Sequence, residues 1–256
     1  MATLHHVDGR TLEPFRIHAV PASRPFVWIA RGWEDLQRHR AASLTYGLLV
    51  AALGALILRL SVHPYVIAAT VCGFLLVGPM LAFGPCELSR RTAHGERVDF
   101  GSSLAPLRHR RRAIAALSST LLAIGATWFL LSWLLLEAML GAAAPSYAQT
   151  IWGDVLAYLS GSQLLSYAAV GAILAAIAFA LSVVSVPMIL DVGADARTAM
   201  STSMRVTIRD LPAMLVWSAL ITTLVALGFA SLLLGMIIVF PLLSHATWHA
   251  YRDLVR

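Results

Sequence analysis

The stretch that decides the fold runs from Leu211 to Tyr251 and reads LPAMLVWSALITTLVALGFASLLLGMIIVFPLLSHATWHAY. It contains 41 residues and no Asp, Glu, Lys or Arg. A hydrocarbon core about 30 Å thick takes roughly 20 helical residues per crossing, so the stretch predicts two membrane spans joined by a short turn. We expect that turn between Gly228 and Gly235, with spans at about 211–230 and 232–251.

The whole chain shares this apolar character. Of its 256 residues, 59% are hydrophobic and 12% are charged, whereas about 25% of a soluble domain is charged. Other uncharged runs predict spans at about 41–59, 64–86, 113–136 and 164–190. The sequence therefore predicts an all-α, polytopic membrane helical bundle with six transmembrane helices. This single membrane domain covers residues 25–256 and follows a polar N-terminal segment, residues 1–24.

The arginines set the predicted orientation. The formal net charge is +6 and every Lys or Arg position is an Arg. With six spans, all of them except Arg59 fall on one side of the membrane, and the opposite loop from Glu137 to Gln163 contains no Arg. Cytoplasmic loops carry the excess of basic residues, so we expect a multi-pass protein of the bacterial inner membrane with both termini in the cytoplasm. Membrane lipids are expected partners and nucleic acid is not, because the arginines lie in short loops beside lipid.

Two segments outside the spans have an amphipathic pattern. Pro25–Arg40 predicts an interfacial helix with Phe26 and Trp33 on its apolar face, and with Trp28 and Trp33 at headgroup depth. The loop after Asp195 predicts a second such helix with Asp195 near its N-cap. The segments 77–80 and 185–188 have similar sequences, which suggests an internal pseudo-repeat. Such a repeat is either a duplicated structural hairpin or the frame of a transporter site.

Small residues recur every four positions in two of the predicted spans. One stripe lies in the fourth span and the other in the first: Ala168, Ala172, Ala176 and Ala180, and Gly47, Ala51 and Ala55. Such stripes let the backbones of membrane helices approach closely. We therefore expect both stripes to be helix–helix contacts.

The last predicted span ends with two histidines, His245 and His249, four residues apart. At this spacing both imidazoles lie on one helix face and could ligate one metal ion. Glu87, Asp191 and Cys86 end other spans at the same predicted depth and are the candidate further ligands. Two other interpretations stay open: haem ligation, or an interfacial belt of both histidines with Trp248 and Tyr251. No cofactor is predicted, and no catalytic motif is visible.

Several blocks of the sequence are similar to a known family. They are Val77-Gly78-Pro79, Glu87-Leu88-Ser89-Arg90-Arg91, Ser182–Met188 and Phe240–Leu254. Together they resemble a family of predicted bacterial integral membrane proteins of unknown function, over about Pro25 to the C-terminus. Members are sometimes named automatically as cytochrome c oxidase subunit I. This chain has too few spans and too few helix histidines for that name. The resemblance implies a multi-pass inner-membrane protein and assigns no catalytic residue.

Three functions remain as hypotheses, and the weakest is a membrane enzyme that acts on lipids, which rests only on the arginine loops. The first is a non-enzymatic subunit, assembly factor or scaffold of a membrane complex, such as a bioenergetic one, that binds other membrane proteins or itself. It rests on the small-residue stripes and on the absence of a charged residue from the predicted centre of any span. The alternative is a transporter or a metal- or haem-handling protein with its site at the cytoplasmic ends of spans two, four and six. That alternative predicts a polar cavity between these three spans.

Overall fold

The computed structural model describes residues 6–7, 10–11, 15–60, 81–140 and 159–255 of the chain. These residues are mainly helical, with one short antiparallel hairpin formed by β1 (His6–Val7) and β2 (Arg10–Thr11). The helices, together with a helical segment at residues 81–93, are α1 (Arg24–Arg38), α2 (Arg40–Leu60), α4 (Phe100–Ser103), α5 (Ala105–His109), α6 (Arg111–Leu140), α8 (Gly161–Ser182), α9 (Ser185–Asp191), α10 (Ala196–Arg209), α11 (Leu211–Ala230) and α12 (Met236–Leu254).

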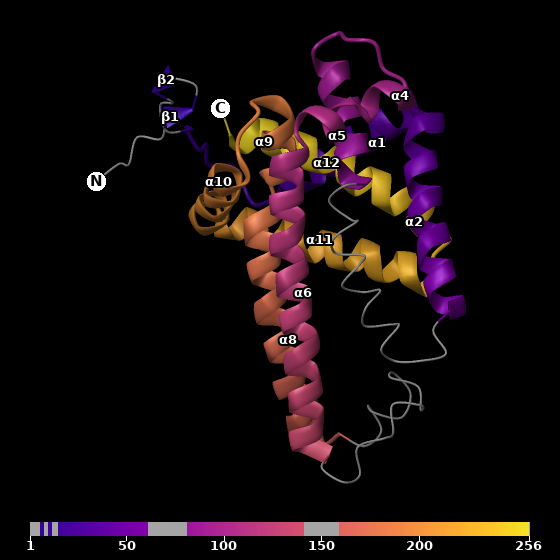
Figure 1. The fold of residues 1–256 in the computed structure, drawn as a ribbon, viewed down its shortest axis with the longest axis vertical. Helices are drawn as coiled ribbons and strands as arrows, with labels where there is room; N and C mark the ends of the chain where they lie inside the picture. The colour runs from indigo at the N-terminus through magenta and orange to yellow at the C-terminus, as the bar shows by residue number, and fades with distance from the viewer. Residues whose placement is uncertain (1–5, 8–9, 12–14, 61–80, 141–158, 256) are drawn as a thin grey trace.

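Helices α6 and α8 lie side by side along the long axis of the molecule (Figure 1). Their contact is aromatic, because the rings of Trp128 and Tyr167 lie 5.1 Å apart, centroid to centroid. The Tyr167 hydroxyl also hydrogen-bonds to Ser132 Oγ at 2.6 Å. Gly171 makes room for Trp128, since a Cβ at this position would lie 3.1 Å from the indole ring. The two long helices thus form a pair held by one ring from each helix, with Gly171 of α8 leaving space for the ring of Trp128.

The decisive stretch forms a helical hairpin, as predicted. Helix α11 covers residues 211–230, the predicted fifth span, and the turn lies at residues 231–235 within the predicted interval. Leu232 and Leu233 adopt φ angles of 53° and 69°, which are strained for residues with a Cβ. Figure 1 shows α11 and α12 slanting across the upper part of the molecule toward α2.

Three of the predicted spans are helices long and apolar enough to cross a membrane. They are Arg111–Met139, Gly161–Asp191 and Leu211–Ala230. The first predicted span forms α2, whose described apolar part, Arg40–Leu56, is shorter. Helix α12 forms at the sixth predicted span, but it is not one of the three. The span at 64–86 and the repeat segment at 77–80 lie largely outside the described residues. The predicted helical architecture is confirmed apart from the short β1–β2 hairpin, with three helices long and apolar enough to span a membrane, and the number of six spans stays a prediction.

Both predicted amphipathic helices form, but α1 is packed differently from the expectation. Phe26 and Trp33 are exposed, as an interfacial helix requires, with 58% and 43% of their surface accessible. Trp28, which the sequence placed at the lipid headgroups, is instead fully buried, and its ring meets that of Trp217 edge to face at 5.7 Å. Helix α1 therefore has one face outside and one face in the core, because it packs along α12. Helix α10 has the predicted N-cap residue, since the Asp195 carboxylate accepts a hydrogen bond from Thr198 N at 2.9 Å.

The two small-residue stripes behave differently. In α2, Gly47 lies against the backbone of Ile237 in α12, Ala51 is buried, and Ala55 is exposed. In α8 the stripe ends in buried Ala180, and its other three alanines, Ala168, Ala172 and Ala176, are exposed. The first stripe is thus in part the predicted helix–helix contact. Most of the second is not covered by the rest of the described chain.

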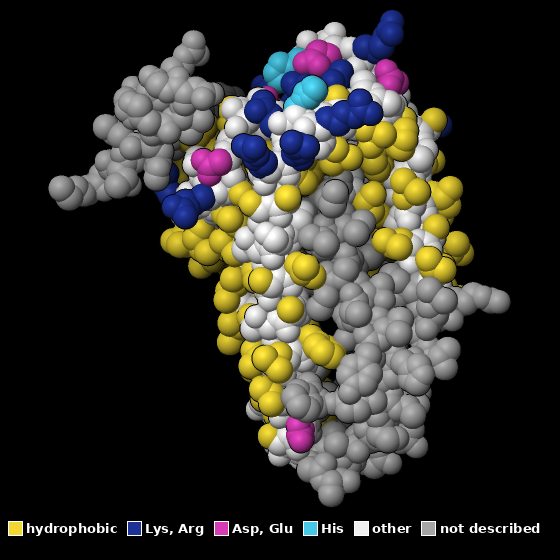
Figure 2. All heavy atoms as spheres, viewed as in Figure 1, with side chains coloured by type: hydrophobic (Ala, Val, Ile, Leu, Met, Phe, Trp, Pro, Cys, Tyr) yellow, Lys and Arg dark blue, Asp and Glu magenta, His cyan; other side chains and the backbone are white. Residues whose placement is uncertain are grey.

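Charged side chains gather at one end of the molecule, above the apolar lengths of α6 and α8 (Figure 2). Residues 17–18 meet the C-terminal end of α12 there, since His18 N donates to Leu254 O at 3.0 Å and Ile17 forms a β-bridge with Val255. We call this charged end the cap. It includes the segment from Arg90 to Arg112, which contains the short helices α4 and α5, and helix α10.

Candidate functional site

The strongest candidate site is a chain of buried polar side chains centred on His245. This residue lies in α12 and has no exposed surface. Its Nε2 atom is 2.9 Å from Ser43 Oγ of α2, and its Nδ1 atom is 2.7 Å from Ser89 Oγ of the 81–93 helix. Both ring nitrogens are therefore hydrogen-bonded to hydroxyl groups that are themselves buried. A buried polar ring needs such partners, because an unpaired one costs the full desolvation penalty.

The chain continues from Ser89 to α1. Ser89 Oγ donates to Asp35 Oδ2 at 2.6 Å, and His249 Nε2 lies 2.9 Å from the same carboxylate oxygen. Asp35 is 6% exposed. Four helical segments are thus connected by one polar chain that runs Ser43, His245, Ser89, Asp35, His249.

The directions of these hydrogen bonds follow from counting protons. Ser89 has one hydroxyl proton and gives it to Asp35, so it must accept from His245 Nδ1–H. In the neutral imidazole the other nitrogen, Nε2, is then an acceptor, and Ser43 donates to it. All donors between Ser43 and Asp35 consequently point the same way, toward the carboxylate. The arrangement could pass a proton along the chain, and its immediate effect is to bind α1, α2 and α12 to the 81–93 helix.

The charge on Asp35 is stabilised by this environment. Burial alone raises the pKa of Asp35, but the hydrogen bonds from His249 and Ser89 act in the opposite direction and outweigh it. The net pKa of Asp35 therefore lies below its ordinary value.

A second contact joins the end of α1 to the 81–93 helix, where His39 Nε2 donates to Thr92 Oγ1 at 2.8 Å. Burial lowers the pKa of His39, because the imidazolium form is poorly solvated there.

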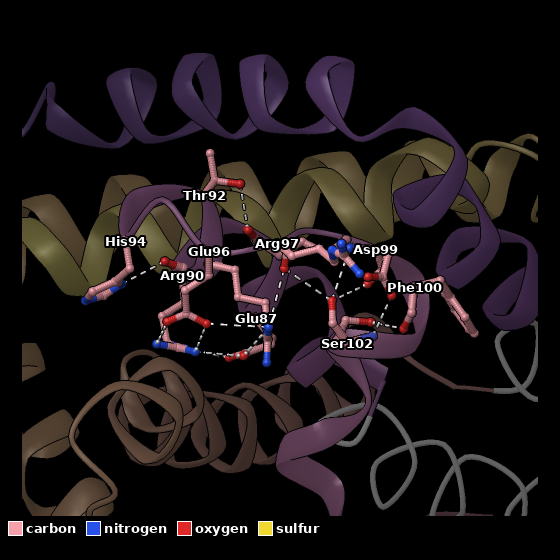
Figure 3. Close-up of polar contacts among 12 residues, drawn as sticks. Glu87, Arg90, Thr92, His94, Glu96, Arg97, Asp99, Phe100 and Ser102 are labelled. Atoms are coloured by element: carbon pink, nitrogen blue, oxygen red, sulfur yellow. Dashed lines mark hydrogen bonds and ion pairs between the residues drawn. The ribbon is translucent and has the colours of Figure 1, made fainter.

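Glu87, a predicted metal ligand, is instead held by arginines. It is 1% exposed and accepts from Arg90 at 2.7 and 2.9 Å and from Arg91 at 2.7 Å. Glu96 contacts the same two guanidinium groups at 3.2 and 3.4 Å, which completes a four-membered charge cluster (Figure 3). A buried carboxylate paired in this way has its charge compensated, and removing a partner is costly.

Asp191, the other predicted acid, ends α9 and has different partners. Its carboxylate accepts from the Tyr251 hydroxyl at 3.0 Å, and His94 Nε2 lies 3.8 Å away. This contact ties α9 to the last turn of α12.

The predicted metal set of His245, His249, Glu87 and Asp191 is therefore not brought together. His245 is bonded to two serines, His249 to Asp35, Glu87 to arginines and Asp191 to Tyr251. No group of three or more His, Cys, Asp or Glu side chains placed to hold a metal ion occurs in the part of the chain that the structure describes. The physical reason is that α1 packs against the histidine face of α12 and supplies its own carboxylate, Asp35, there.

The interfacial belt is also wrong as an interpretation of this helix end. Trp248 and Tyr251 are 1% and 3% exposed, and His245 is not exposed at all. Their rings lie in the protein core and not among lipid headgroups. Sequence reasoning missed Ser43, Ser89 and Asp35 as partners. The available signal was that two histidines in an apolar segment require buried hydrogen-bond partners if the segment is covered by protein.

A cavity of about 310 Å³ lies where the carrier hypothesis expected one, between the ends of spans two, four and six. Its walls include Ala82 and Cys86, Ser182 and Val186, and Leu243 and Ser244. The lining is mainly apolar, so the expected polar character is wrong. The Cys86 thiol is occupied as well, since it donates to Ser244 O at 2.9 Å.

Comparison with known proteins supports the membrane assignment. Residues 66–191 match a family described as predicted integral membrane protein (DUF2189). The matched range contains the Val77–Pro79, Glu87–Arg91 and Ser182–Met188 blocks, whereas the Phe240–Leu254 block lies beyond it. Neither a curated protein nor a solved structure matches the chain.

Proposed function

We propose that this chain, a predicted integral membrane protein by its match to the DUF2189 family, is a non-enzymatic subunit or scaffold of a membrane protein complex. The observation that carries the proposal is the exposed alanine face of α8. Ala168, Ala172 and Ala176 lie at spacing four on a helix apolar enough to span a membrane, and each is exposed. A neighbouring face of the same helix packs on α6 through Gly171 and Tyr167.

An exposed alanine stripe is a suitable surface for a second membrane helix. Lipid tails are as apolar as helix side chains, so association within a membrane depends on close van der Waals packing rather than on a hydrophobic drive. Small side chains allow the two backbones to approach and thereby increase that packing. Within Arg111–Met139 and Leu211–Ala230 only 28% and 22% of the apolar window is buried in this chain, so other helix surfaces also face outward.

The cap supports a location on the cytoplasmic side of a bacterial inner membrane. The arginines of the segment from Arg90 to Arg112 and of α10 lie at this end, where Ile17 also meets Val255. The positive-inside rule places such an end in the cytoplasm. A fluorescent protein fused after Arg256 is expected to fold and fluoresce, whereas alkaline phosphatase fused at the same position is expected to be inactive. A dark fluorescent fusion together with an active phosphatase fusion would contradict this orientation.

Co-purification tests the proposed function. Affinity-tagged protein extracted in a mild detergent is expected to carry one or more membrane proteins at fixed stoichiometry. The variant Ala172→Leu should lose them, because a larger side chain on the stripe keeps the partner backbone at a distance. The matched control is Ala126→Leu, which adds the same bulk at an exposed position of α6. A clean monomer in several detergents, or equal partner yield from both variants, would contradict the proposal. A second copy of this chain as the only partner would identify self-association.

A further inference from the structure

Helix α10 carries three arginines on the face that it turns away from the rest of the protein. Arg197, Arg205 and Arg209 are all exposed, whereas the buried residues of the helix occupy its opposite face. Positions four or eight residues apart lie on one side of a helix, so the three side chains follow one stripe roughly 18 Å long. Ser201 and Ile208 are exposed between them. We call these five residues the outer face of α10, and none of them is an acid.

The charges of the outer face are not compensated within the described part of the chain. None of the ion pairs among the described residues includes an arginine of this face. The two acids that flank α10 have other partners. Asp195 accepts hydrogen bonds from Thr198 N and Thr198 Oγ1, both at 2.9 Å, and Asp210 accepts one from Val20 N at 3.2 Å. The outer face therefore attracts an anion from outside the chain.

The packing of α10 places its outer face at the depth of the membrane surface. The buried side of α10 is fixed to the end of α8, where Val184 N donates to Ser203 Oγ at 3.4 Å. Val184 lies within the last two turns of the apolar stretch Gly161–Asp191. At its other end, α10 is separated only by Asp210 from α11, which is also long and apolar enough to span a membrane. Helix α10 thus lies where two candidate spans reach the cap.

Large apolar side chains are exposed among these charges. Ile208 is 70% exposed, and Leu211, the first residue of α11, is 52% exposed. Such a mixture suits the boundary between lipid headgroups and acyl chains, where an arginine stem covers apolar surface and its guanidinium group reaches a phosphate. Around the cap, dark-blue side chains directly border hydrophobic ones (Figure 2). This pattern favours a lipid surface over an acidic soluble protein.

A second basic group lies beside α10, at the start of α6. Arg108, Arg111 and Arg112 are exposed, and none of the ion pairs among the described residues includes them. Arg110 connects this group to α10, because its guanidinium group lies against Gly193 in the segment before that helix. Clusters of about 4–8 basic residues next to a membrane span are typical of surfaces that bind anionic lipids.

We propose that the outer face of α10 binds anionic phospholipid headgroups in the membrane leaflet next to the cap. Its three guanidinium groups contact lipid phosphates, whose oxygens match the planar fork of arginine, and Ile208 lies among the upper ends of the acyl chains. The proposal does not depend on the alanine face, which lies on α8. Ala172→Leu should lose the protein partner and keep the lipid preference, so the two proposals fail independently.

The test compares two lipids that differ only in the headgroup. Purified wild-type protein in a mild detergent is titrated with phosphatidylglycerol and with phosphatidylcholine that carry the same oleoyl chains, and native mass spectrometry counts the bound lipid. Each basic side chain near an anionic surface contributes about fivefold in affinity, or about 1 kcal/mol, so phosphatidylglycerol should bind at least about tenfold more tightly. Equal affinity of the wild-type protein for the two lipids would overturn the proposal without requiring any variant.

Salt provides a second measurement on the wild-type protein. The screening length falls from about 10 Å to about 3 Å as the ionic strength rises from about 0.1 M to about 1 M. The preference for phosphatidylglycerol should shrink over this range, because the contacts lie at the protein surface. A preference that does not change with salt would contradict headgroup binding by exposed arginines.

Variants assign the preference to α10. Arg205→Gln and Arg209→Gln each remove one charge from an exposed position and should lower the preference about fivefold. Arg205→Lys keeps the charge and should keep most of the preference. Arg97→Gln is the matched control, because Arg97 is an exposed arginine between the 81–93 helix and α4, outside both basic groups. The melting temperatures of these variants should equal that of the wild type, since none of the three arginines takes part in an ion pair among the described residues.

The double variant Arg205→Gln, Arg209→Gln decides between a lipid and a protein as the occupant of the outer face. An unchanged preference for phosphatidylglycerol in this variant, or an equal fall in Arg97→Gln, would overturn the assignment. Loss of a co-purified acidic protein from the double variant, with the lipid preference unchanged, would assign the outer face to a protein partner instead.

Discussion

At the scale of single residues, His245 shows how a polar group becomes a structural centre in an apolar chain. Its two ring nitrogens join Ser43 to Ser89, and Ser89 passes the connection to Asp35. Because every member of this chain is buried or partly buried and satisfied, the chain binds specific helix faces to one another. Losing one member would leave the others unpaired in a region of low dielectric, where an unpaired polar group is most costly.

Replacing His245 with Ala should therefore destabilise the protein strongly. The change leaves a space in the core and deprives both Ser43 and Ser89 of a partner, for a combined cost of about 2–4 kcal/mol. The melting temperature of detergent-solubilised protein, followed by circular dichroism, should fall by several degrees. His109→Ala is the control, since His109 is exposed at the end of α5. Similar melting temperatures for both variants would show that the buried chain contributes little.

Two partly buried carboxylates, Asp35 of the site and Asp253 near the end of α12, predict a dependence of stability on pH. The pKa of Asp35 is lowered in the folded protein, and so is that of Asp253, where burial raises the pKa but hydrogen bonds from Arg24 and Trp28 outweigh it. A pKa lowered by folding gives stability that is present above the unfolded value, about 3.9 for Asp, and that is lost as the pH falls through the folded value. The melting temperature should thus decline below about pH 4.

Asp35→Asn separates this effect from general acid unfolding. The variant lacks one titrating group, so its melting temperature should decline less steeply between about pH 4 and pH 3 than that of the wild type. Glu34→Gln provides the control, because Glu34 is the exposed neighbour on α1. If Asp35→Asn and Glu34→Gln change the acid limb of the curve to the same extent, Asp35 has no special part in it.

At the scale of helices, the close packing of α2 on α12 depends on a missing side chain. A Cβ at Gly47 would overlap the backbone carbonyl of Ile237, which cannot move without shifting α12. Gly54 lies seven residues, about two helical turns, further along the same face, against Leu233 of the turn. This contact positions α12 so that His245 reaches Ser43 on α2.

Gly47→Ala should consequently cost about 1–3 kcal/mol through overpacking, although Ala is the better helix former. Thermal unfolding measures this loss. Gly161→Ala is the matched control in the first turn of α8, where an added Cβ meets nothing within 4 Å. A neutral or stabilising effect of Gly47→Ala would show that Gly47 of α2 does not lie against the backbone of Ile237 in α12.

Sequence patterns predicted the positions of the helices along the chain better than the helices and side chains that pack against them. Long uncharged runs located α6, α8 and α11 because their length follows from the thickness of the membrane. The turn near Leu232 was predicted from the same arithmetic. The placement of α1 was not, because its amphipathic pattern does not show whether Trp28 and Asp35 face lipid headgroups or another helix. The partners of His245 were missed for the same reason: Ser43 and Ser89 lie more than 150 residues away along the chain.

At the scale of the whole molecule, the charged cap and the apolar helices divide the chain into two parts. The cap includes the bridge between Ile17 and Val255 and is held together by the Glu87 cluster and the buried polar chain. The helices α6 and α8 extend away from it (Figure 1), and the alanine face of α8 is exposed. A cap held together by buried polar contacts, with membrane helices extending from it, is suited to holding a partner in place within the membrane.

Crosslinking in intact membranes tests this central claim most directly. A photoreactive amino acid is placed at Leu165, an exposed leucine one turn before Ala168 on the same face of α8, and separately at Ala126 on α6. After illumination, and before any detergent is added, the Leu165 position should yield one discrete protein adduct that mass spectrometry identifies, whereas the Ala126 position should yield none or a different one. A Leu165 position that labels only lipid would contradict the account.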